Sequence, residues 1–331
     1  MRRIVFAFAV IFALAATAVA GAAQKGSTLS LVAYSTPREA YAKLIPMFQA
    51  TPAGKDVSFT QSYGASGDQA RAVQAGLKAD IVALSLPPDV DQLVKAGLVD
   101  AKWNRQSYGG IVTNSVVVFA VRDGNPKHIR SWDDLLKPGV EVITPNPFTS
   151  GGARWNVMAA YGAWRKLGKS RGQAQEKLLQ LFQHVAVQDK SARDSLNTFL
   201  SGKGDVLLTY ENEAIGAQLA GMKVQYVIPR STILIENPIA VLKNSSNKDT
   251  ANAFIRFVKT PAAQQAFADR GYRPIIKSVL AKNRAKFPVR PGQFTIDQLG
   301  LGGWAKVQKD FFDPNRGVMA VIERKVGGAT G

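Results

Sequence analysis

The stretch PNPFTSGG, residues 145–152, decides how this chain is organised. The preceding VEVIT at 140–144 alternates as a β-strand does, and residues 153–167 carry apolar side chains at helical spacing. The prolines end the strand, Ser150 is placed to cap the helix, and the two glycines leave its first turn bare. Unpaired N–H groups and the positive end of the helix dipole then suit a small anion. A capped helix after a strand is also ordinary architecture, so this stretch alone leaves both interpretations open.

The start of the chain has the pattern of a secretory signal peptide, expected over residues 1–23. A basic head precedes an apolar run at 4–19, which ends in small residues of the A-x-A type. We expect cleavage after Ala20 or Ala23, and the run is short for a spanning helix. The alternative is an uncleaved anchor. With the signal peptide cleaved, the mature protein is expected in the periplasm.

The composition is typical of an exported protein that folds on its hydrophobic core alone. The 331 residues include no cysteine, which excludes disulfides and a lipid attached at a cysteine. They include 42 Lys and Arg against 24 Asp and Glu, a formal net charge of +18. The basic residues are scattered and form no groove interleaved with aromatics, so we expect general surface charge and no nucleic-acid partner. A basic polyanion-binding adhesion protein remains an alternative class.

Strands and helices alternate along the chain, which predicts an α/β fold with mostly parallel sheets. The expected strands are at 29–34, 57–63, 80–84, 111–121, 140–144, 185–187, 205–210, 223–228 and 239–242. A first helix is expected to run to about residue 50, and later helices are expected at 69–75, 89–96, 153–167, 195–202, 248–258, 261–269, 275–286 and 317–325.

The length suits two lobes rather than one core. The chain is expected to cross between them near 111–121 and 229–242. We therefore expect one lobe from 24–115 and 238–331, a second lobe from 116–237, and a ligand cleft between them.

Polar turns follow several of the expected strands, where ligands of open parallel sheets bind. Four of them pair a hydroxyl with a small residue, and a fifth strand ends in an aromatic hydroxyl: Tyr34-Ser35-Thr36, Ala65-Ser66-Gly67, Ser150-Gly151-Gly152, Lys190-Ser191-Ala192 and Tyr210. Each turn alone is typical of a helix cap. Together they would surround an anion with neutral donors, each hydrogen bond to the charge contributing about 1.5–3 kcal/mol.

The sequence shows no paired catalytic groups and no metal-binding motif. Its only histidines are His128 and His184, and without cysteine they form no His/Cys cluster. There is no nucleophile elbow, Walker A loop or dinucleotide fingerprint. Asp80, Asp205 and Glu211 flank strands, but nothing pairs them as acid and base. We expect no catalytic residues, metal or cofactor; a secreted enzyme remains an alternative that turnover would reveal.

The motifs together resemble the sulfate and thiosulfate periplasmic binding proteins, which serve ABC importers. The resemblance spans about residues 29 to 313. It is carried by the block at 142–156 and by the motif QSYGASGDQ at 61–69. Shorter matches lie at 121–127, 132–135, 197–199, 204–207, 211–214 and 302–304.

This resemblance implies the type II fold of periplasmic binding proteins, with two lobes that close on a hinge. It also implies a membrane permease as partner, a monomer, and an oxyanion bound without water. The main-chain donors it implies are Ser35, Ser66, Gly151, Gly152 and Ala192, and the side-chain donors are Ser150 and Tyr210.

Two positions depart from the family pattern. Ser35 stands where the family usually has Asp, and Tyr210 stands where sulfate relatives usually have Trp. The first change matters little if only a main-chain N–H is used. The second replaces an indole N–H by a phenol O–H, which can both donate and accept. We therefore expect sulfate as the ligand, with thiosulfate, molybdate or tungstate as alternatives.

Overall fold

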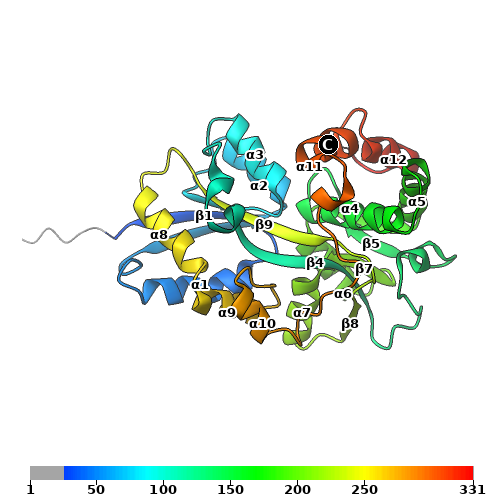
Figure 1. Ribbon diagram of the computed structural model, residues 1–331, viewed down its shortest axis with the longest axis horizontal. Helices are drawn as coiled ribbons and strands as arrows, with labels where there is room; N and C mark the ends of the chain where they lie inside the picture. The colour runs from blue at the N-terminus through cyan, green and yellow to red at the C-terminus, as the bar shows by residue number, and fades with distance from the viewer. Residues whose placement is uncertain (1–25, 331) are drawn as a thin grey trace, which may run out of the picture.

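Two lobes joined by a pair of long strands make up the protein (Figure 1). The computed structural model describes residues 26–330. The expected signal peptide at 1–23 lies outside the described residues, and so does its cleavage site. Within 26–330, no helix combines the length and the apolar character needed to cross a membrane.

The first lobe is a parallel sheet covered by helices on both faces. Its strands are β1 (Thr28–Tyr34), β2 (Ser58–Gly64) and β3 (Ile81–Ala83), with β1 in the middle. Alternate β1 residues point to opposite faces. Leu31 packs with α1 (Arg38–Gln49) and α8 (Lys248–Val258), while Val32 packs with α2 (Ser66–Gln74) and α3 (Pro87–Lys95). The helices α9 (Pro261–Asp269) and α10 (Lys277–Lys282) follow α8.

The second lobe repeats this design around β5 (Val142–Pro145). This strand lies between β6 (Val185–Asp189) and β7 (Val206–Tyr210), and both pair with it in parallel. The helices of this lobe are α4 (Gly151–Lys166), α5 (Arg171–Gln183), α6 (Ala192–Leu200) and α7 (Glu211–Leu219). Residues 151–164 of α4 are buried on every side, as expected of a helix enclosed by a sheet and other helices.

The hinge consists of β4 (Ile111–Arg122) and β9 (Leu234–Val241), which run antiparallel to each other. The first half of β4 pairs with β9, and its second half pairs with β7 and with β8 (Val224–Val227). The end of β9 pairs with β3 of the first lobe. One sheet of nine strands therefore passes through both lobes. The predicted α/β fold with two crossings is confirmed.

The C-terminal segment packs on the second lobe. The helices α11 (Gly303–Phe312) and α12 (Val318–Val326) share a core with α4 and α5, and the rings of Phe311 and Tyr161 lie 4.8 Å apart. This packing differs from the expected assignment of 238–331 to the first lobe, because helical spacing does not reveal a helix's packing partner. We propose that the segment from Phe294 onward belongs with the second lobe.

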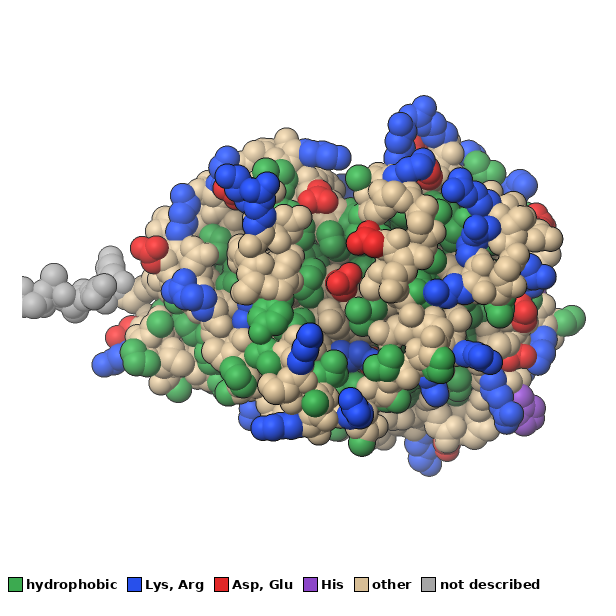
Figure 2. Space-filling model, viewed as in Figure 1, with side chains coloured by type: hydrophobic (Ala, Val, Ile, Leu, Met, Phe, Trp, Pro, Cys, Tyr) green, Lys and Arg blue, Asp and Glu red, His purple; other side chains and the backbone are tan. Residues whose placement is uncertain are grey.

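Basic side chains are spread over both lobes in the face shown, rather than gathered into one stripe (Figure 2). A buried ion pair lies beside the hinge. Arg273 binds both carboxylate oxygens of Glu211, at 2.6 and 2.9 Å, and both side chains are at most 3% exposed. The main chain of Arg273 pairs with Asn114 in β4. Burial raises the pKa of Glu211, against the effect of Arg273.

We predict that Arg273→Ala lowers the free energy of unfolding by about 3–5 kcal/mol, because it leaves the Glu211 carboxylate buried without a partner. The matched control is Lys306→Ala, which breaks an exposed pair with Asp310 and should cost less than about 1 kcal/mol. Urea unfolding of both variants measures the difference. Equal losses of unfolding free energy would show that the buried pair contributes no more to stability than the exposed pair.

Candidate functional site

All seven predicted site residues are buried at the carboxyl ends of strands. They follow β1, β2, β5 and β6 or end β7: Ser35, Ser66, Ser150, Gly151, Gly152, Ala192 and Tyr210. Four of these strand ends lead, directly or through a short turn, into helix N-termini, namely those of α2, α4, α6 and α7. The arrangement therefore directs several sets of helix N–H groups toward the space between the lobes.

The first turn of α4 forms the wall on the side of the second lobe. Ser150 caps the helix, with its Oγ accepting from the Ala153 N–H at 3.4 Å. A Cβ atom placed on Gly152 would lie 3.2 Å from Ala192 Cβ and 2.9 Å from Tyr210 Cε2. The start of α4, the start of α6 and the end of β7 are thus brought together.

The first lobe supplies the opposite wall. A Cβ atom on Gly151 would lie 2.5 Å from Ser85 Oγ and 2.2 Å from Leu86 Cδ2, both just after β3. The Ser66 hydroxyl accepts from the Ser85 N–H at 2.9 Å and donates to Asp89 at 2.5 Å. That hydroxyl is therefore engaged, and the predicted ligand role of Ser66 depends on its main-chain N–H at the start of α2.

Ser35 is linked to the other predicted residues through its neighbours. The ring of Tyr34 lies 6.0 Å from the ring of Tyr210, and the buried Tyr34 hydroxyl has no hydrogen-bond partner among the described residues. On the other side, Thr36 Oγ1 accepts from Asn212 at 3.4 Å. A ligand role for the Ser35 N–H stays a prediction.

Buried charges near the site are paired with one another. Arg154 of α4 binds Asp89 of α3 across the cleft, with Nη1 and Oδ1 3.1 Å apart and both side chains at most 8% exposed. Burial raises the pKa of Asp89 and lowers that of Arg154, and each partner opposes the shift of the other. Because Asp89 also accepts from Ser66, its carboxylate is occupied and does not confront an incoming anion.

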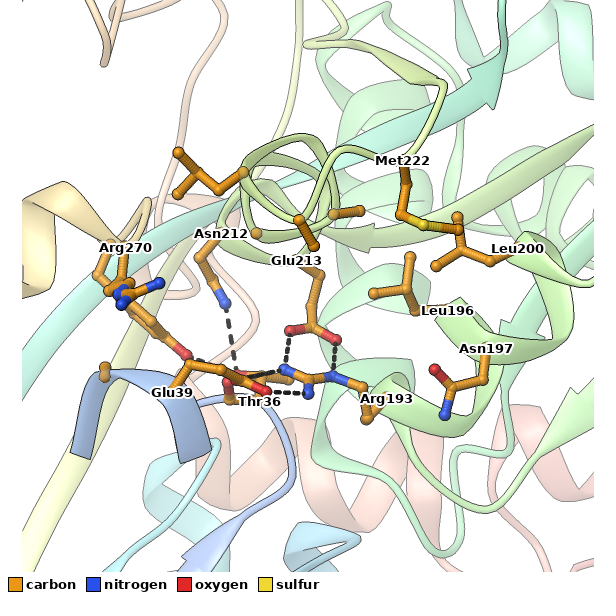
Figure 3. A pocket seen from close by; sticks show the side chains of 16 residues that line it. Thr36, Glu39, Arg193, Leu196, Asn197, Leu200, Asn212, Glu213, Met222 and Arg270 are labelled. Atoms are coloured by element: carbon orange, nitrogen blue, oxygen red, sulfur yellow. Dashed lines mark hydrogen bonds and ion pairs between the residues drawn. The ribbon is translucent and has the colours of Figure 1, made fainter. Parts of the chain in front are cut away.

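A second cross-cleft ion pair lies in a neighbouring pocket of about 230 Å³. There Arg193 of α6 binds Glu213 of α7 and Glu39 of α1 at 2.7–2.9 Å (Figure 3). Despite the opposing effect of burial, the two carboxylates raise the pKa of Arg193. Burial raises the pKa of Glu213, and Arg193 opposes this. Arg193, Glu213 and Glu39 are therefore paired with one another, and the pocket contains none of the seven predicted site residues.

Hydrogen bonds to backbone carbonyls also close the cleft. The Gly67 N–H donates to the Thr149 carbonyl at 3.0 Å, which joins the start of α2 to the turn before α4. The Trp155 indole of α4 donates to the Ser85 carbonyl at 2.9 Å. The lobes therefore meet over the predicted site.

Four residues that lie at or near the cleft were not among the predicted site residues: Ser85, Asp89, Arg154 and Arg193. Ser85 also follows a strand, but Pro87 and Pro88 take the place of a recognisable cap motif. Arg154 stands in a helix whose neighbouring positions are apolar, and a lone charge there is a signal that could have identified it as a buried, paired residue. Within residues 26–330, no group of three or more His, Cys, Asp or Glu side chains is placed to hold a metal ion.

The known proteins that this chain resembles in sequence and in structure are extracellular solute-binding proteins. Residues 29–273 match the family model described as bacterial extracellular solute-binding protein. The sulfate-binding protein of Synechococcus elongatus is 45% identical, over 86% of this chain and 83% of its own length. The thiosulfate-binding protein of Pseudomonas aeruginosa is 34% identical, over 90% and 93%. The solved sulfate-binding protein SubI of Mycobacterium tuberculosis H37Rv is 44% identical, covers 87% of this chain and 100% of its own, and has a TM-score of 0.84.

We predict that Gly151→Ala weakens binding of the expected oxyanion by about 1–3 kcal/mol, the usual cost of overpacking. The new methyl group would collide with Ser85 and Leu86 and hold the lobes apart. The control is Gly172→Ala in the exposed first turn of α5, where no atom lies within 4 Å of the added Cβ and affinity should not change. Calorimetry measures both. Unchanged affinity of Gly151→Ala would contradict the position of Gly151 at the closed cleft.

Proposed function

The chain belongs to the bacterial extracellular solute-binding proteins, in the group of the sulfate- and thiosulfate-binding proteins, and from this we propose that it captures sulfate between its lobes and delivers it to the permease of an ABC importer. Its role is binding, without catalysis. The proposed location is the periplasm, after cleavage of a signal peptide at 1–23, and the proposed form is a monomer.

One observation carries this proposal: buried helix N-termini converge on a place where the nearby buried charges are already paired. The starts of α4 and α6 and the end of β7 meet there. Asp89 and Arg193 lie close by, yet both are held in ion pairs. A dianion in this place would be stabilised by N–H groups and hydroxyls, which spread its charge over local dipoles without a buried counter-ion.

Sulfate is the ligand that this donor set fits best. Its oxygens accept hydrogen bonds and carry no proton at neutral pH, so donors alone satisfy them. Thiosulfate, which replaces one oxygen by a larger sulfur, is the alternative, with molybdate and tungstate after it. Greater identity to the sulfate-binding relative than to the thiosulfate-binding relative supports this order.

The closed arrangement of the two lobes is a form of the protein that a permease could recognise. Arg154–Asp89 and Arg193–Glu39 join the lobes only when these face each other. A ligand that contacts both walls favours the closed form by its differential affinity for it. We propose that the permease meets this closed form.

We predict that sulfate binds more tightly than phosphate by at least about 1–3 kcal/mol at pH 8. Monohydrogen phosphate carries a proton that would lose its acceptor on entering a site built from donors. Calorimetry with sulfate, thiosulfate, molybdate and phosphate tests this. Equal affinities for phosphate and sulfate would contradict a donor-only site.

We predict that Ser150→Ala weakens sulfate binding by about 1–3 kcal/mol, the value of one hydrogen bond to a charged group. Ser170→Ala is the matched control, because Ser170 caps α5 in the same way but on the surface. It should lower stability by about 0.5–2 kcal/mol and leave affinity unchanged. If both variants bind sulfate as the wild type does, Ser150 is only a cap.

A further inference from the structure

Ser85 is fixed from three directions at the closed cleft. Its N–H donates to Ser66 Oγ at 2.9 Å. Its carbonyl accepts from the Trp155 indole at 2.9 Å and from the Asn237 amide at 2.8 Å. These partners lie on α2, α4 and the hinge strand β9, and Ser85 itself is 1% exposed. The main chain of Ser85 is therefore held by elements of both lobes.

The Ser85 hydroxyl meets the Tyr210 hydroxyl across the cleft. The two oxygens are 2.6 Å apart, within the usual range of an O–H···O hydrogen bond. Both lie against the first turn of α4: Ser85 Oγ is next to Gly151, and the Tyr210 ring is next to Gly152. The pair thus stands beside the N–H groups proposed to hold the anion.

The pair has one hydrogen to spare. Two hydroxyls carry two hydrogens, and the bond between them uses one. Neither oxygen has another hydrogen-bond partner among residues 26–330. Burial raises the pKa of Tyr210 well above its ordinary value, so its phenol stays protonated. Because a phenol is the more acidic donor, the favoured arrangement has Ser85 donating to Tyr210 and Tyr210 donating to the anion. Each hydrogen bond then strengthens the next.

A tyrosine needs such a partner more than a tryptophan would. An indole N–H points in one direction fixed by the ring, whereas a phenol O–H rotates about its C–O bond and can also act as an acceptor. A neighbour that donates to Tyr210 Oη occupies one of its lone pairs and leaves the phenol hydrogen for the ligand. Ser85 is placed to do this.

We propose that Ser85 is a positioning residue for the oxyanion: its hydroxyl donates to Tyr210 Oη and directs the Tyr210 O–H toward the ligand beside Gly151. The inference rests on the proposed sulfate-binding function. It ties ligand recognition to closure, because Ser85 belongs to the first lobe and Tyr210 to the second. Ser85 thus acts through Tyr210.

A double-mutant cycle measured by calorimetry with sulfate tests the proposal. Ser85→Ala and Tyr210→Phe should each weaken binding about tenfold, and the double variant should also lose about tenfold rather than a hundredfold. Ser85→Thr keeps the hydroxyl and should bind more tightly than Ser85→Ala. Ser201→Ala removes a surface hydroxyl that bonds Thr198 and should leave affinity unchanged.

Two results would overturn the role of Ser85. The first is wild-type affinity in Ser85→Ala. The second is an equal loss from Ser85→Ala in the wild type and in Tyr210→Phe, which would mean that Ser85 acts independently of Tyr210. Thermal unfolding without sulfate identifies variants that fail to fold. If Ser85→Ala fails to fold, the affinity of Ser85→Thr relative to the wild type shows whether the hydroxyl is needed for binding. If the wild type binds no oxyanion, the proposed function itself fails; if it binds sulfate and only the cycle fails, the function stands.

Discussion

The first N–H groups of an α-helix have no carbonyl partner within the helix, and the rest of this structure depends on that constraint. In a buried place such groups require an acceptor from elsewhere. Parallel strands that lead into helices through short turns bring several of these ends to one edge of a lobe. Contacts such as Trp155 with Ser85 and Arg154 with Asp89 then join the two lobes there. We propose that the fold thereby gathers such donors at the predicted site. An anion with several acceptor oxygens is the natural complement of such a site.

The charged residues around the cleft follow from the same constraint. A buried charge without a partner is costly, and a free carboxylate near the site would repel an anion. Asp89 is held by Arg154, and Glu213 by Arg193, so neither carboxylate is free. Because Arg154 and Arg193 also reach residues of the first lobe, the same side chains link the lobes. Charge neutralisation and closure are therefore achieved by shared residues.

The sequence predicted the local structure around the expected site where local rules apply. The cap at Ser150, the bare glycine turn and the helix start at Ala192 depend on neighbouring residues, and the structure has them in place. The first half of β9 was missed, because Asn237 and Pro238 interrupt its apolar pattern and only pairing with β4 makes it a strand. The packing of α11 and α12 against α4 was missed for a similar reason. The Ser85–Tyr210 contact joins residues 125 positions apart, and no local pattern encodes it.

The role proposed for the contact between these two hydroxyls couples ligand specificity to closure of the lobes. A donor carried by a single lobe would favour the anion equally in the open and the closed form. A donor whose direction is set by the other lobe favours the anion only after closure. Since a ligand shifts an equilibrium by its differential affinity for the two forms, such a donor contributes to closure as well as to binding. In the proposed arrangement, a phenol that depends on Ser85, in place of the indole usual in sulfate relatives, transfers part of the binding free energy from the open to the closed form.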